Sequence, residues 1–85
     1  MSDIKLVKLK SGEELIGDVT VVGDSVTIAN PCQIIPTQDG LGFAPWPPFS
    51  KNSNVTIKTD WTICITEPVD AARDAWNSKF GSGIV

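Results

Sequence analysis

Few side chains in this sequence could carry out a reaction. Histidine and tyrosine are absent, which removes the commonest general base, the usual partner of a nucleophilic Ser or Cys, and the best nitrogen ligand for zinc. Acids do lie together at Glu13 and Glu14, with Asp18 nearby, but adjacent acids in a turn are far more often solvated surface than an acid/base pair. We therefore expect no enzymatic activity, no metal and no cofactor.

Cys32 and Cys64 are the two cysteines, too few and too isolated to form a disulfide framework. Each lies in a run typical of a strand, where a reduced thiol behaves as a small apolar side chain. We predict that both are buried. The glycines are spread through turns and one strand, so they form no phosphate-binding loop before a helix.

Binding is the remaining chemistry, and aromatic side chains are its candidates. Proteins hold unpaired bases by stacking them on aromatic rings, at about 1–3 kcal/mol per base. The aromatic candidates are Phe43, Trp46, Phe49 and Trp61. Core packing is the alternative for Trp61, which lies on an apolar face, and a subunit interface or a loop folded onto the domain is the alternative for Trp46 and Phe49.

The chain length and charge limit how such binding is organised. The 85 residues, 41% hydrophobic, fit one domain spanning 1–85. The hydrophobic core of so small a domain gives only marginal stability. We therefore expect the chain to self-associate. The net charge of −3 argues against a protein that coats nucleic acid through its overall charge.

No apolar run is long enough to span a membrane, and residues 1–5 do not resemble a signal peptide, so we expect a cytoplasmic protein.

Three strands are predicted in the first part of the chain, over about 4–10, 15–22 and 26–35. Ser-Gly-Glu and Gly-Asp turns join them, and β-branched residues are frequent within them. Gly17, inside the second strand, predicts a bend or a close backbone approach. Pro31 cannot donate to a ladder, so it predicts a break, a bulge or an edge in the third strand.

The second part of the chain alternates between strand and loop signals. Asp39 and Gly40 predict a tight hairpin, and three prolines within 42–50 predict a semi-rigid aromatic loop. Alternating apolar residues over 55–65 predict one core-facing surface, in two strands with a kink near Thr59 and Asp60.

An amphipathic helix is predicted over about 68–80. Pro68 suits its first position, and Lys79 with Gly81 suits its end. Its apolar stripe consists of Val69, Ala72, Trp76 and Phe80.

The first three strands resemble the first motif of the Sm-like family. The resemblance lies in Leu9, Ser11, Gly12, Gly17 and Asp24, and the run over 57–60 is similar to the second motif. It implies a small bent five-stranded SH3-like barrel over about 4–66. It also implies a homomeric ring of five to seven subunits that binds single-stranded RNA or DNA. More narrowly, the chain resembles small Sm-like proteins attributed to cyanophages, which would place it in the host cytoplasm.

Nucleic-acid contacts implied by the resemblance fall on Asn30, Lys58 and Asp60, with Phe43, Trp46 and Phe49 as auxiliary stacking or interface residues. Thr27 and Ile28 stand where the family has Met and Asn, so Asn30 is the candidate replacement for the pocket asparagine. Lys58 stands for an Arg and Thr59 for a Gly. These departures, the acidic balance and the apolar proline-rich loop favour an alternative function, a structural or adaptor ring that binds a protein partner without nucleic acid.

Overall fold

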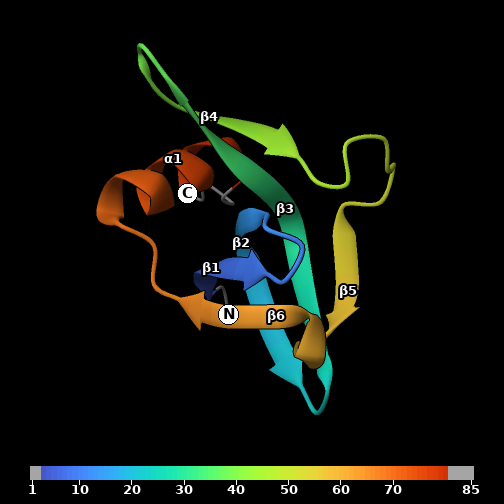
Figure 1. Cartoon of the computed structure of the whole chain (residues 1–85). Coiled ribbons are helices and arrows are strands. Elements are labelled where there is room, and N and C mark those ends of the chain that lie inside the picture. Colours follow the sequence, from blue (N-terminus) through green and yellow to red (C-terminus); the bar gives the residue numbers. More distant parts are fainter. Residues whose placement is uncertain (1–2, 81–85) are drawn as a thin grey trace.

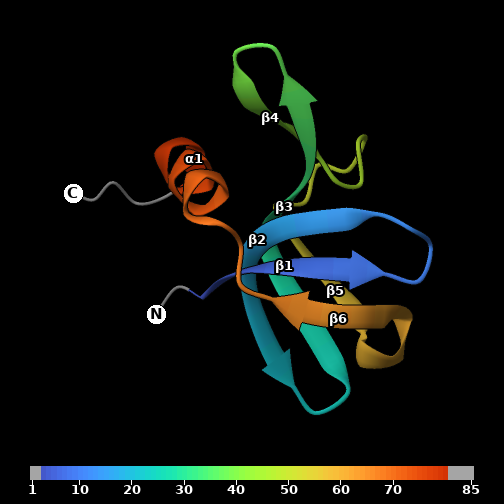
Figure 2. The same ribbon diagram turned by 60° about the vertical axis from the view of Figure 1, so that its left-hand side comes forward.

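The computed structural model describes residues 3–80 as one bent antiparallel sheet followed by a helix (Figure 1). The elements, in chain order, are β1 (Ile4–Leu9), β2 (Glu14–Val22), β3 (Ser25–Thr37), β4 (Gly40–Pro45), β5 (Asn54–Lys58), the 3₁₀ helix η1 (Thr59–Trp61), β6 (Thr62–Thr66) and α1 (Asp70–Phe80). The strand order is β4-β3-β2-β1-β6, and β5 also pairs with β3. Figure 2 shows β1 between β2 and β6. None of the helical structure within residues 3–80 is long and apolar enough to cross a bilayer.

The predicted mainly β fold with a C-terminal helix is confirmed, but the predicted number of five strands is wrong. The structure has six strands, because the proline-rich segment separates β4 from β5. The first half of β3 pairs with β5 and its second half pairs with β4. The proline-rich loop, residues 46–53, therefore leads the chain from one half of β3 to the other.

Close contact between β2 and β3 depends on Gly17. A Cβ atom at this position would lie 2.4 Å from Ile28 Cγ2 and 2.9 Å from the Ala29 carbonyl oxygen. The predicted close backbone approach is confirmed, since any side chain here would force one of the two strands to move.

A bulge in β3 changes which side of the sheet its residues face. Asp18 is opposite Ala29 whereas Ile16 is opposite Cys32, so β3 has one extra residue between these pairs. Asn30 has a φ of +51°, which places the irregularity beside Pro31. Of the break, bulge or edge predicted at Pro31, the structure shows a bulge. Because side chains alternate along a strand, one extra residue reverses the inward and outward sets beyond it.

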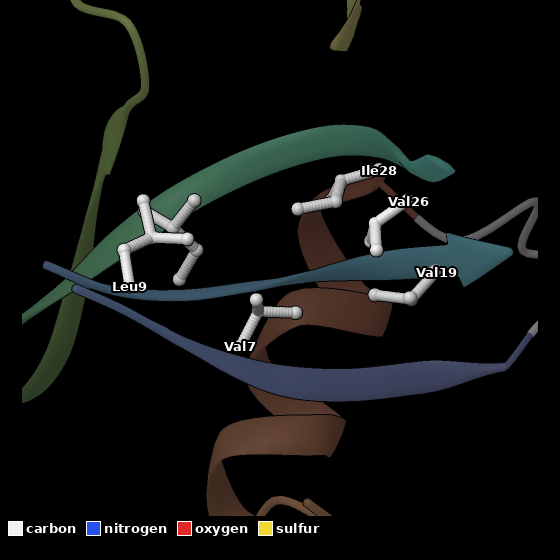
Figure 3. Packing of buried hydrophobic residues seen from close by; sticks show 6 residues of the cluster. Val7, Leu9, Val19, Val26 and Ile28 are labelled. Atoms are coloured by element: carbon white, nitrogen blue, oxygen red, sulfur yellow. The ribbon is translucent and has the colours of Figure 1, made fainter. Parts of the chain in front are cut away.

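Two hydrophobic clusters result, one on each side of the sheet. The inner core consists of Val7, Leu9, Leu15, Val19, Val26 and Ile28 (Figure 3). The helix-side core consists of Ile4, Ile16, Cys32, Ala72 and Trp76. Val26 and Ile28, before the bulge, belong to the inner core, and Cys32, after it, belongs to the helix-side core. The bulge thus lets one strand serve both clusters.

The chain turns sharply between β5 and β6, as predicted for the region of Thr59 and Asp60, because η1 separates the two strands. The prediction that the whole apolar face of 55–65 is buried is wrong. Trp61 is 49% exposed and Ile63 is 61% exposed. The 3₁₀ turn ends the alternation, and Ile63 is the extra residue of a bulge, since Lys8 is opposite Cys64 and Leu9 is opposite Thr62.

Burial of the two cysteines is predicted correctly for one of them only. Cys32 is 1% exposed, whereas Cys64 is exposed. Cys64 lies on β6, which has a paired neighbour on one side only within residues 3–80. A strand at the edge of a bent sheet leaves more of its side chains in solvent than a central strand does.

Helix α1 begins two residues later than the predicted Pro68. The Val69 carbonyl accepts hydrogen bonds from the amides of Ala72 and Arg73, each at 3.0 Å, so Val69 caps the helix. The Val69 side chain, predicted to be part of the apolar stripe, is 69% exposed. Ala72 and Trp76 are each 3% exposed and anchor the helix to the sheet. The predicted closing residue, Gly81, lies outside the described residues.

Candidate functional site

Two segments that are distant in sequence meet at one end of the sheet. The Thr59 amide donates to the Asp24 carbonyl at 2.8 Å, and Lys58 Nζ lies 3.7 Å from Asp24 Oδ2. Asp60 follows in the first turn of η1. These four residues, which we call the rim, combine the turn after β2 with the end of β5.

Charge at the rim is not strongly positive. The side chains of Lys58 and Asp24 are 75% and 77% exposed, and an exposed pair of this kind contributes about 0–1 kcal/mol. Asp60 adds a second carboxylate beside the single cation. Any phosphate that binds here must therefore compete with Asp24 for Lys58.

Asn30 does not lie at the rim. In the register of β3 and β5, Lys58 is opposite Ser25 whereas Asn54 is opposite Ala29. At roughly 3.3 Å per residue, these two ends of β5 are about 13 Å apart. The structure thus brings Lys58 and Asp60 together but leaves Asn30 at the far end of β5. Within one chain Asn30 does not replace the missing asparagine beside Lys58.

Asn30 instead lines a pocket of about 100 Å³ between the bulge of β3, the proline-rich loop and the end of α1. We call this the loop pocket. Its apolar walls include Cys32, Trp46, Pro47 and Phe80. Its polar lining residues are Asn30, Ser50, Asn52 and Ser53. It therefore combines two predicted site residues, Asn30 and Trp46.

Backbone hydrogen bonds fix the walls of the loop pocket. The Asn30 amide donates to the Ser53 carbonyl at 2.6 Å, and the Trp46 amide donates to the Pro31 carbonyl at 3.0 Å. Trp76 Nε1 donates to the Asn30 carbonyl at 3.2 Å. The loop, the bulge and α1 are thereby joined around one residue, Asn30, whose side-chain amide has no hydrogen-bond partner within residues 3–80.

Trp46 packs against the inner core and lines the loop pocket. Its Nε1 donates to Glu13 Oε2 at 3.4 Å. A hydrogen bond from the Ser11 hydroxyl is the main cause of the lowered pKa of Glu13, with smaller help from Trp46. Trp46 therefore packs onto the domain, as in the alternative of a loop folded onto the domain.

The other two aromatic candidates have different surroundings. Phe43, on β4, packs against the helix-side core. Phe49, in the proline-rich loop, is 99% exposed and free to contact a partner. Phe80 and Asn52 were not predicted as lining residues, because Phe80 was assigned to the helix stripe and no sequence pattern around Asn52 indicates a pocket. Only the fold brings the loop and the end of α1 together.

Two lysines are next in sequence to residues that line the loop pocket. Lys51 lies between the lining residues Ser50 and Asn52, and Lys79 precedes the lining residue Phe80. Lys79 Nζ lies 5.7 Å from the centroid of the Phe80 ring. Neither lysine has an acid within 4.0 Å in the described part of the chain, unlike Lys5, Lys58 and Arg73. The lysines next to the lining residues are thus unpaired within residues 3–80, whereas Lys58 at the rim is paired with Asp24.

No known protein-family model matches this chain, and no curated protein sequence matches it. The rim, the loop pocket and the open edges of the sheet are the features of this chain that point to a function.

Proposed function

We propose that this chain is a non-enzymatic Sm-like module, with an SH3-like barrel, that assembles into a homomeric ring and binds single-stranded RNA or DNA at its rim. The observation that carries the proposal is the contact between Asp24 and the segment Lys58–Asp60. The two sequence segments that resemble the Sm motifs are thereby adjacent in space. The cytoplasmic location and the phage origin stay predictions.

Open sheet edges support assembly. Within residues 3–80, β5 pairs only with β3 and β6 pairs only with β1. Both strands have five residues, and an unpaired edge is a template for a strand of another chain. Pairing the β5 of one copy with the β6 of the next is a head-to-tail contact, which produces a ring when the rotation closes.

Assembly is tested by native mass spectrometry of the wild type and of Ile63→Lys. Ile63 lies on the open edge strand and is 61% exposed, so a lysine there should block strand pairing without disturbing the core. Val69→Lys is the matched control, since Val69 is 69% exposed and lies outside the sheet. A strictly monomeric wild type at micromolar concentration would exclude the ring.

Nucleic-acid binding is tested by fluorescence anisotropy with U-rich and A-rich oligonucleotides at two salt concentrations. Lys58→Ala should weaken binding and reduce the salt slope by about one. Asp24→Asn should strengthen binding, because it frees Lys58 from its acidic partner. Lys10→Ala, a change of the same charge in the turn after β1, is the control. Binding that is equal in the wild type and in Lys58→Ala would remove the rim from the proposal.

An adaptor ring that binds a protein is the second candidate function, favoured by the proline-rich loop. Phe49 is 99% exposed and follows Pro47 and Pro48 in this loop, and exposed apolar patches mark protein interaction sites. A Phe49→Ser variant that keeps its oligomeric mass but loses a co-purifying protein would support this function over the first.

A further inference from the structure

We propose that the loop pocket is a docking site for an acidic peptide segment of a partner protein, anchored by one aliphatic side chain. This inference rests on the adaptor function and not on nucleic-acid binding at the rim. Four properties of the pocket lead to it: its volume, its walls, its amide groups and the charge at its mouth.

Volume limits what can enter. The loop pocket measures about 100 Å³, which is less than the ~150 Å³ cavity that holds a benzene ring. A branched aliphatic side chain fits this space, whereas a nucleobase or a phenyl ring does not enter fully. Size therefore favours Ile, Val or Leu as the anchor.

Walls of the pocket suit such an anchor. Trp46, Pro47, Cys32 and Phe80 present apolar surface that an aliphatic side chain can cover. Hydrogen bonds to Asn30 and Pro31 join the loop, the bulge and α1, which carry these residues. The pocket is therefore formed before a ligand arrives. A preformed site spends less of its interaction free energy on ordering.

Amide side chains stand where a peptide backbone would run. Asn30 and Asn52 line the pocket, and neither side-chain amide has a hydrogen-bond partner within residues 3–80. Each amide has both donors and an acceptor. That combination matches the N–H and C=O groups on either side of an anchoring residue.

Charge complementarity selects an acidic segment. Lys51 and Lys79, each next in sequence to a lining residue, have no acidic partner in the part of the chain that the structure describes. In a protein of net charge −3, two such lysines around one apolar pocket favour a ligand with carboxylates on both sides of its anchor. Opposite charges also increase the rate of association.

Binding of an acetylated fluorescein-labelled peptide, Glu-Asp-Ile-Asp-Glu, to the full chain tests the proposal. Replacing the peptide Ile by Ala should weaken binding about tenfold, since it removes three carbons from a half-open apolar site. Lys51→Glu and Lys79→Glu should each weaken binding about threefold at low salt, and less at 0.5 M salt. Lys10→Glu is the control, because Lys10 carries the same charge away from the pocket.

Indole N–H signals locate the peptide. The chain has three tryptophans, and the peptide should shift the signal of Trp46, which lines the pocket, more than the signal of Trp61, which does not line it. Equal affinity for the Ile and Ala peptides would overturn the proposal, as would binding that only Lys58→Ala weakens.

Other occupants would also overturn it. If an oligonucleotide shifts Trp46 and competes with the peptide, the pocket binds nucleic acid. Failure of oligonucleotides to bind at the rim leaves the peptide result unaffected, so the two functions fail separately.

Discussion

Gly17 is the residue on which the packing of β2 against β3 depends. We expect Gly17→Ala to lower the free energy of unfolding by about 1–3 kcal/mol, because its Cβ would lie 2.4 Å from Ile28 Cγ2 and 2.9 Å from a carbonyl oxygen. Urea denaturation measures the change. Gly42→Ala is the control, since the nearest atom to its Cβ would be 3.4 Å away. Equal stability of the two variants would contradict this account.

The two thiols should differ in reactivity. Cys32 is 1% exposed, and burial raises the pKa of its thiol. Cys64 is exposed on β6. Since the thiolate is the reactive form, we expect iodoacetamide at pH 8 to modify one cysteine per native chain, Cys64, and both in urea. Mass spectrometry of peptides identifies the modified residue; modification of Cys32 at the same rate as Cys64 would show that the helix-side core opens readily.

At the scale of elements, Glu67 joins three parts of the chain. Its carboxylate accepts hydrogen bonds from Lys5 on β1 and from Arg73 on α1. The Lys5 hydrogen bond is the main cause of the lowered pKa of Glu67, and the same bond raises the pKa of Lys5. The linker between β6 and α1 is thereby attached to the first strand.

Acid should remove this attachment. A carboxyl group with a lowered pKa in the folded state stabilises the fold above its unfolded pKa, roughly 4.3 for Glu, and loses that effect as the pH falls through the folded value. We expect Glu67→Gln to lower Tm at pH 7 and to have little effect near pH 3. Thermal denaturation at both pH values measures this. Asp74→Asn, at an exposed helix position, is the control, and a difference in Tm that persists at pH 3 would argue against the ion pair.

The turns and strands could be predicted from local sequence, whereas the loop pocket could not. Gly12, Gly23 and Gly40 have positive φ values, and their turns were predicted because glycine adopts such angles at low cost. The loop pocket was not predicted, because it needs α1 to lie beside the proline-rich loop, and no local pattern specifies that contact. Trp61 was misplaced for a related reason, since alternation continues in a sequence even where a 3₁₀ turn interrupts the strand.

At the scale of the molecule, the two clusters should differ in how easily they open. The helix-side core contains only Ala72 and Trp76 of α1 among its buried members. We expect the amides of α1 to exchange with deuterium through a partial opening, well before those of β2. Hydrogen-exchange mass spectrometry with peptides from both elements tests this. Simultaneous exchange of α1 and β2 would show a single cooperative unit.

Pairing between β1 and β6 also determines when folding can finish. Leu6 is opposite Thr66, so a contact across about sixty residues adds the last strand to the sheet, and long-range pairings of this kind slow folding. During synthesis, β1, β2 and β3 can form a meander early, but β1 keeps one edge unpaired until β6 has left the ribosome. For that interval β1 is an exposed edge, and the three lysines on and next to it, Lys5, Lys8 and Lys10, are the kind of residues that discourage aggregation of a nascent strand.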